Sequence, residues 1–261
     1  MNTRAKKSLG QNFLNAPSVI KKMIDVCNLE EGDLVVEVGP GKGALTKVLL
    51  ERNLRVVAYE LDPRMIDYLN EHYASYVASG QLQLLQQDIL GLDISEVFSE
   101  HSYTVVANIP YYITNAIIRL FLSAQHQPRA MSLLVQKEVA ERIARDEAES
   151  ILSMSVKVYG EPRYVTKVAR RYFTPSPKVD SAVIAIFNIS RDRFDSKKHE
   201  EVFFHLVKLG FAHKRKQLAS NLASDGFDKK YWQEQLSLLG YPPTVRAQEL
   251  SVEDFLLLSS G

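Results

Sequence analysis

Residues 35–44 read VVEVGPGKGA, an apolar run that ends in three closely spaced glycines. A short apolar run of this kind is typical of a strand that is buried on both faces of a sheet. Glycines directly after the strand allow the backbone to turn sharply and to come close to a ligand. Residues 44–52 then follow a helical apolar pattern, so the glycines lie at a strand-to-helix junction.

The alternation of strand and helix extends over the first 190 residues. Buried strands are predicted at 34–38, 55–59, 82–85, 104–107 and 131–135, and helices at 44–52, 63–76 and 114–124. Residues 164–168 and 182–187 also read as strands, whereas 151–159 fit either period. Strands that alternate with helices predict an α/β fold with a parallel sheet and right-handed crossovers.

The composition changes after Phe187. Residues 190–198 form a charged break, and the patterns that follow are helical, at 200–209, 214–223, 228–239 and 252–258. We therefore expect two domains, an α/β domain over residues 1–190 and a small all-helical domain over residues 191–261.

The overall composition excludes several classes of protein. The chain has 261 residues, 46% hydrophobic and 24% charged, which suits a globular protein rather than a disordered one. A lone cysteine, Cys27, cannot form an internal disulfide, and the basic start has no apolar run after it, so we expect a cytoplasmic protein. No apolar stretch approaches the length of a membrane span, and no metal-ligand spacing is present. The absence of coiled-coil patterning favours a monomer.

Three kinds of ligand compete for the glycine turn. A Walker phosphate loop fails, because Val36 and Gly43 stand where it needs a glycine and a Ser or Thr. Gly39-x-Gly41-x-x-Ala44, with Glu60 about 20 residues later, satisfies the dinucleotide-binding fingerprint and allows a nicotinamide enzyme. An S-adenosylmethionine (SAM) site of pattern Glu-x-Gly-x-Gly-x-Gly is also satisfied.

Two acids at strand ends favour the SAM interpretation. Glu60 follows the second predicted strand and would bind ribose hydroxyls, and Asp88 follows the third and would receive the adenine amine. Open α/β sheets bind ligands at the carboxyl ends of their strands, so these acids are expected beside the glycine turn.

Asn108-Ile109-Pro110-Tyr111 follows the fourth predicted strand and therefore opens at the same edge. The pattern suits methyl transfer to a planar nitrogen, whose lone pair is delocalised and weakly nucleophilic. The side-chain carbonyl of Asn108 and the main-chain carbonyl of Pro110 can accept hydrogen bonds from an adenine amine and hold it in line with the methyl group. Tyr111 can stack on the base.

Taken together, the chain closely resembles the ribosomal RNA adenine dimethyltransferase family over nearly its whole length. Residues 10–14, GQNFL, are similar to the family's opening motif, and residues 173–181 and 210–218 to its later motifs. The resemblance implies that Gln11, Asn12, Leu14, Gly39, Gly41, Glu60, Asp88 and Asn108 bind SAM, and that Phe173 holds the target base opposite Tyr111. Lys214 stands where the family pattern has Arg, which keeps the charge but not a bidentate phosphate contact.

The resemblance also implies a Rossmann-like methyltransferase fold, with seven strands, the last one antiparallel, and it makes residues 151–159 helical. Within the family, the chain is more similar to the branch that dimethylates two adjacent adenines near the 3′ end of small-subunit (16S) rRNA during ribosome biogenesis. Alternatives are the resistance-type enzyme that acts on large-subunit rRNA, and an assembly factor that works mainly by binding.

Local charge supports an RNA partner independently, although the net charge is only +1. Clustered Lys and Arg neutralise phosphates and release counterions. We expect RNA contacts, and no DNA substrate, from three clusters: Arg4, Lys6 and Lys7; Arg170 and Arg171; and Lys214, Arg215 and Lys216.

Overall fold

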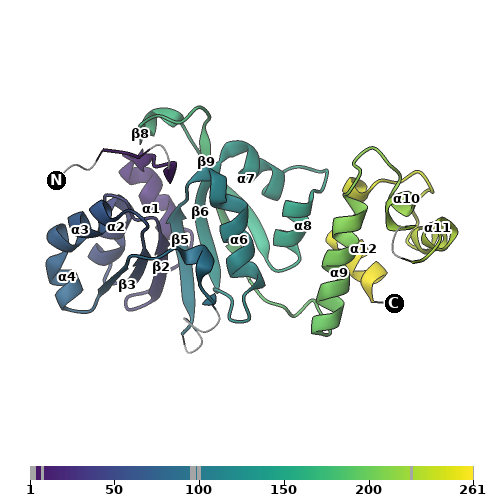
Figure 1. Cartoon of the computed structure of the whole chain (residues 1–261), viewed down its shortest axis with the longest axis horizontal. Coiled ribbons are helices and arrows are strands. Elements are labelled where there is room, and N and C mark those ends of the chain that lie inside the picture. The colour runs from purple at the N-terminus through teal and green to yellow at the C-terminus, as the bar shows by residue number, and fades with distance from the viewer. Residues whose placement is uncertain (1–3, 7–8, 95–97, 99–100, 224–225, 261) are drawn as a thin grey trace. The chain divides into compact units, whose positions relative to one another are not determined.

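The computed structural model describes residues 4–6, 9–94, 98, 101–223 and 226–260. Within it the chain forms two compact units (Figure 1). The first comprises the residues up to 144 together with 161–189, and the second comprises 145–160 together with the residues from 190 onward.

The first unit is built on a seven-stranded sheet of order β4-β3-β2-β5-β6-β9-β7. In that order the strands are Leu82–Leu85, Arg55–Tyr59, Leu34–Val38, Tyr103–Asn108, Ala130–Gln136, Ser181–Phe187 and Glu161–Val168. The first five are parallel, and β9 is antiparallel to both of its neighbours. The predicted α/β fold and the antiparallel last strand are confirmed.

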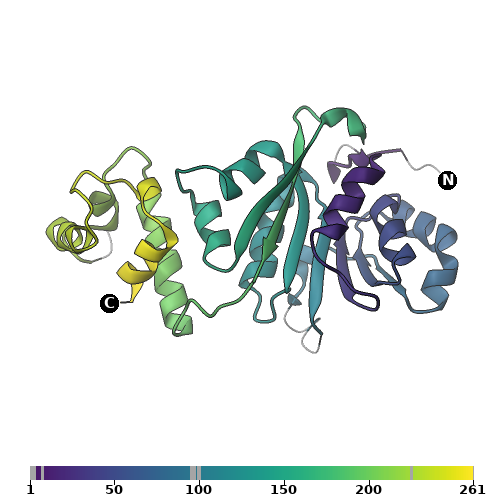
Figure 2. The ribbon, with the colours of Figure 1, turned by 180° about the vertical axis from the view of Figure 1, so that it is seen from behind.

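Helices cover both faces of this sheet. They are α1 (Pro17–Asp25), α2 (Ala44–Glu51), α3 (Pro63–His72), α4 (Ala74–Ala78), α6 (Thr114–Ser123) and α7 (Lys137–Ala144). Helix α1 lies over the face that Figure 2 turns to the viewer, and α6 lies over the opposite face. Both faces of the central strands are therefore shielded from solvent, and all five residues of β2 are buried.

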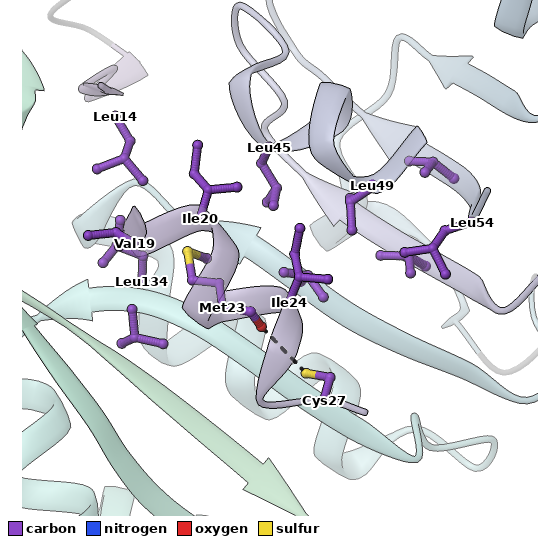
Figure 3. Close-up of a cluster of buried hydrophobic side chains, with 14 of the residues drawn as sticks. Leu14, Val19, Ile20, Met23, Ile24, Cys27, Leu45, Leu49, Leu54 and Leu134 are labelled. Atoms are coloured by element: carbon purple, nitrogen blue, oxygen red, sulfur yellow. Dashed lines mark hydrogen bonds between the residues drawn. The ribbon is translucent and has the colours of Figure 1, made fainter. Parts of the chain in front are cut away.

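Helix α1 joins the N-terminal end of the chain to the core. Met23 and Ile24 are fully buried. Ile24 points toward Leu49 of α2, and the Met23 side chain lies on the side of Val19 and Leu134 (Figure 3). Cys27 follows the helix and is buried, with its thiol 3.7 Å from the carbonyl oxygen of Met23. Burial raises its pKa to about 12, so the thiol is a packing group rather than a nucleophile.

A second, two-stranded sheet pairs β1 (Phe13–Leu14) with β8 (Phe173–Thr174). Leu14 lies opposite Phe173, so this pairing brings the start of the chain to the loop before β9. Strands of two residues carry no periodic pattern, and the sequence did not predict them.

The second unit is helical, with α8 (Ile151–Lys157), α9 (Lys197–Gly210), α10 (Leu218–Leu222), α11 (Lys229–Leu238) and α12 (Val252–Ser259). Its core includes the fully buried Phe203 and Phe255. Tyr159, which follows α8, stacks on Phe204 at 5.7 Å, and its hydroxyl donates to Glu200. These contacts group residues 145–160 with the C-terminal helices, although the sequence placed them in the domain over 1–190.

Two predicted helices differ in extent from those observed. The helix expected at 63–76 is divided at Tyr73 into α3 and α4. The helix expected from residue 214 begins at Leu218. The side-chain amide of Asn221 donates to the carbonyl oxygens of Gly210 and His213, which holds the preceding residues in a turn. No helix in the described ranges combines the length and the apolar character needed to cross a bilayer.

Candidate active site

A pocket lies at the carboxyl ends of β2, β3, β4 and β5. Its walls come from residues 9–15, the glycine loop, residues 59–61, 87–89 and 108–113, and Phe173. Every residue that the sequence assigned to cofactor binding or catalysis lines it: Gln11, Asn12, Leu14, Gly39, Gly41, Glu60, Asp88, Asn108, Pro110, Tyr111 and Phe173. The structure therefore brings these residues together, while their individual roles remain predictions.

The glycine loop needs glycine for steric as well as conformational reasons. Gly41 and Gly43 have φ values of 55° and 76°, in the left-handed region. A Cβ on Gly41 would lie 2.9 Å from the Phe13 ring, and one on Gly43 would lie 2.7 Å from the Tyr73 ring. Two aromatic side chains, Phe13 and Tyr73, therefore pack against the loop.

Glu60 connects the end of β3 to the glycine loop. One carboxylate oxygen accepts from the Gly41 N–H at 3.0 Å, and the other accepts from the Asp62 N–H at 2.9 Å. Burial raises the pKa of Glu60, and the backbone donors, those of Asp62 and Gly41 first, oppose that shift. The carboxylate is held in one orientation at the pocket wall.

Two further acids flank the pocket in different environments. Glu37 is buried under the loop and accepts from the Thr46 hydroxyl at 2.8 Å, and burial raises its pKa to about 8. Asp88 is exposed and accepts from the Leu90 N–H at 3.0 Å, which begins the short helix η2 (Ile89–Gly91). The Asp88 carboxylate keeps further acceptor positions for a ligand.

Asn108 ends β5 and is oriented by the N-terminal segment. Its side-chain N–H donates to the Asn12 carbonyl oxygen at 3.1 Å, and the Asn12 side chain donates to the Gly10 carbonyl oxygen at 3.0 Å. No group in the described part of the chain donates to the Asn108 side-chain oxygen. The amide therefore offers a fixed acceptor at the pocket.

The next residues complete the catalytic turn. The Pro110 carbonyl oxygen accepts from the Ile113 N–H at 3.1 Å and has a second lone pair free for another donor. The Tyr111 hydroxyl lies 2.6 Å from the Ser181 hydroxyl, at the start of β9. Burial raises the pKa of Tyr111, so its ring is neutral at physiological pH.

Phe173 is 4% exposed and belongs both to the pocket wall and to the adjoining hydrophobic core. Its position opposite Leu14 is set by the β1–β8 pairing. A ring so deeply packed presents a limited apolar surface to a ligand, which suits a wall against a flat base.

The basic residues predicted to bind RNA fall in different places. Arg170 and Arg171 are exposed on the short helix η4 (Arg170–Tyr172). This helix directly precedes Phe173, which lines the pocket. Lys6 is instead paired with Asp62 at 3.3 Å, and Lys7 lies outside the described residues. Arg4 is exposed, as are the second unit's Lys214, Arg215 and Lys216.

Sequence reasoning missed two residues that organise the site, Asp62 and Ser181. Asp62 precedes Pro63 and is the N-cap of α3, which an Asp-Pro pair at a predicted helix start could have indicated. No pattern in the sequence around Asp62 indicates its hydrogen bonds to Lys6 and Gln11. Ser181 is 70 residues from Tyr111, and nothing in the sequence links the two.

Fold and site together define a class. A glycine loop, acids after the two strands on one side of it, and Asn-x-Pro-Tyr after the strand on the other side are the parts of an α/β methyltransferase that uses SAM. Comparison with known proteins makes this specific. The model of the family described as "Ribosomal RNA adenine dimethylase" matches residues 2–259, and the chain belongs to that family.

Named relatives agree with this assignment. Ribosomal RNA small subunit methyltransferase A of Fusobacterium nucleatum is 36% identical over 99% of this chain and 97% of its own length. The protein of the same name from Dehalococcoides mccartyi is 39% identical over 97% and 86%. A dimethyladenosine transferase from Plasmodium falciparum, 26% identical, superposes with a TM-score of 0.77 over 94% of this chain and 96% of that one.

The pocket also fits the cofactor. Its walls combine backbone N–H groups of the loop, carboxylates after β3 and β4, and apolar side chains such as Leu61 and Ile89. A Cβ on Gly39 would meet nothing within 4 Å, so the space beside this glycine is open. Carboxylates suit ribose hydroxyls and an adenine amine, and the chain is a methyltransferase that uses SAM.

Proposed function

We propose that this protein dimethylates two adjacent adenines near the 3′ end of small-subunit rRNA at N6, and that it acts in the cytoplasm as a monomer during ribosome biogenesis. The family and the names of its relatives support the reaction and the substrate. The observation that supports the chemistry most directly is the orientation of the Asn108 amide. Its N–H donates to the Asn12 carbonyl oxygen, which leaves its side-chain oxygen as an acceptor at the pocket.

The residues act by orienting a poor nucleophile. In the first transfer, an adenine amine donates its two hydrogens to the Asn108 side-chain oxygen and the Pro110 carbonyl oxygen, which aligns the nitrogen and stabilises the positive charge that develops on it. In the second transfer, the monomethylated amine donates its remaining hydrogen to one of these oxygens. Each transfer replaces one hydrogen of the amine, which leaves as a proton. Tyr111 stacks on the base, and its hydroxyl on Ser181 fixes the plane of the ring. SAM, when bound, supplies the electrophilic methyl group.

The remaining residues hold the two substrates. Glu60 accepts hydrogen bonds from ribose hydroxyls, and Asp88 accepts one from the adenine amine of the cofactor. Arg170 and Arg171 contact phosphates close to the base pocket, and Lys214, Arg215 and Lys216 contact RNA from the second unit. A target adenine must leave its stack to enter, which unpaired segments of structured RNA allow at low cost.

A methyl-transfer assay tests the proposal. Purified protein and labelled SAM are incubated separately with unmethylated small subunits, large subunits and naked rRNA, and nucleosides are then analysed. Dimethyladenosine with small-subunit material alone supports the proposal. A Glu60→Ala variant should raise the Kd for SAM, and thermal stabilisation by SAM but not by NAD separates a methyltransferase from a dehydrogenase.

A second candidate substrate is supported by another structural relative. The 23S rRNA methyltransferase ErmE, 26% identical, superposes with a TM-score of 0.76 over 95% of this chain and 98% of that one. Dimethyladenosine from large-subunit RNA in the same assay would favour this alternative. Tight binding to small subunits without methylation would favour an assembly factor.

A further inference from the structure

Within the N-terminal segment, here Lys6 and residues 9–14, residues 9–14 form one wall of the pocket from outside the seven-stranded sheet. Its position matters for chemistry, because the Asn12 carbonyl oxygen is the group that orients the Asn108 amide. The segment must therefore be fixed to the sheet unit by something that does not depend on a bound ligand.

Asp62 provides such a fixed point. Its side chain is fully buried at the start of α3, just after β3. Its two oxygens accept from the Lys6 ammonium at 3.3 Å, from the Gln11 side-chain amide at 3.2 Å and from the Arg64 guanidinium at 3.0 and 2.6 Å. Charge-assisted bonds to a buried carboxylate are the stronger kind of hydrogen bond.

Gln11 carries this anchor into the segment. Its side-chain N–H donates to Asp62, and its side-chain oxygen accepts from the Lys6 backbone N–H at 2.8 Å. The backbone N–H groups of Leu9 and Gln11 donate in turn to the Lys6 carbonyl oxygen. The segment is thus closed on itself and tied to Asp62 by the same side chain.

We propose that Asp62 is a positioning residue for methyl transfer, whose carboxylate fixes the N-terminal segment against the cofactor pocket and, through Asn12, sets the orientation of Asn108. This inference rests on the proposed function. It also reassigns Gln11 and Lys6, which act first as ties to Asp62 and not as direct contacts to cofactor or RNA.

The ionisation state of Asp62 is consistent with this role. The Arg64 side chain, followed by Gln11 and Lys6, holds the pKa of Asp62 well below its usual range despite burial. The anchor is therefore charged throughout the physiological pH range.

The substitution Asp62→Asn isolates the anchor. Asn caps a helix as well as Asp does, so α3 keeps its N-cap. With the Asn oxygen retained at the helix N-terminus, its NH₂ group faces the Gln11 NH₂ group, and the bond between them is lost. Hydrogen exchange of the ligand-free protein should then quicken several-fold in the peptide over residues 9–14 and stay unchanged elsewhere. The Kd for SAM should rise about tenfold, and kcat should fall while KM for RNA holds.

A reciprocal substitution restores the bond. Gln11→Glu alone sets two carboxylates against each other and should loosen the segment as Asp62→Asn does. In the double variant Asp62→Asn/Gln11→Glu, the Asn NH₂ donates to the Glu carboxylate, so slow exchange and SAM affinity should return toward the parent values. Asp25→Asn is the matched control, because it removes an exposed carboxylate that pairs with Arg52 at 2.6 Å.

The outcomes separate the possibilities. Unchanged exchange and SAM affinity in both single variants would overturn the proposal, and so would additive losses without rescue in the double variant. If the parent protein methylates no rRNA while exchange and SAM affinity follow the expected pattern, the proposed function fails but the anchoring role of Asp62 stands.

Discussion

The phenol of Tyr111 has two separable parts, a ring at the pocket and a hydroxyl 2.6 Å from the Ser181 hydroxyl. Tyr111→Phe removes the second part alone. Ser181 is fully buried, so the loss leaves a buried polar group with one partner fewer, which costs about 1–3 kcal/mol. For a chain of this size each kcal/mol lowers Tm by about 2–4 °C.

Catalysis should respond differently to the two parts. Tyr111→Phe keeps the ring, so we expect kcat to fall less than tenfold. Tyr111→Ala removes the stacking face, which is worth about 1–3 kcal/mol per base. This free energy corresponds to a fall in kcat/KM for RNA of about 5- to 150-fold. The Kd for SAM should stay within about twofold in both, because the assigned cofactor groups are untouched.

Steady-state kinetics on unmethylated small subunits, calorimetry with SAM and thermal unfolding measure these quantities. Tyr241→Phe is the matched control, since its hydroxyl donates to Asp254 at 2.7 Å in the second unit, and it should lower Tm alone. Equal activity losses in Tyr111→Phe and Tyr111→Ala would refute the stacking role. Full activity of Tyr111→Ala would refute any role in catalysis.

Three further predictions concern the loop and the catalytic turn. Asn108→Ala should lower kcat about 10²- to 10³-fold while SAM still binds, and near-normal kcat would contradict the acceptor role. The pKa of about 8 at Glu37 exceeds its unfolded value of 4.5, so the stability from the neutral carboxyl is complete below pH 4.5 and declines as pH rises toward 8. Glu37→Gln, which can still accept from Thr46, should flatten Tm between pH 5 and 8, and an unchanged slope would exclude this group. Gly43 has a φ of 76°, and a Cβ there would lie 2.7 Å from the Tyr73 ring. Gly43→Ala should therefore destabilise the protein by more than about 1 kcal/mol, measured by urea unfolding. An unchanged unfolding midpoint would mean that the Tyr73 ring moves aside.

The sequence predicted the part of the site that strand order determines. Glu60, Asp88 and Asn108 lie at or just after the carboxyl ends of parallel strands, and parallel strands bring these ends to one edge of the sheet. Reading strands from apolar runs was therefore enough to place these side chains around the glycine loop.

The supporting contacts could not be read in the same way. Asp62 meets Lys6 from 56 residues away, and Tyr111 meets Ser181 from 70 residues away. Both pairs depend on tertiary packing between distant parts of the chain, and local periodicity carries no record of such packing. The same limit explains why the sequence did not predict β1 and β8, and why it gave no sign that Tyr159 contacts Phe204.

The path of the chain between the two units has a consequence for dissecting the protein. The polypeptide leaves the first unit after residue 144, returns at 161 to make β7 and β9, and leaves again after 189. A chain cut at residue 190 would keep α8 and Tyr159 but lose Phe204 and Glu200, against which Tyr159 packs and hydrogen-bonds. In the truncated protein, apolar side chains of residues 145–160 would be exposed to solvent, which favours aggregation. Independent expression of the methyl-transfer unit therefore requires two excisions, with residues 145–160 replaced by a short polar turn.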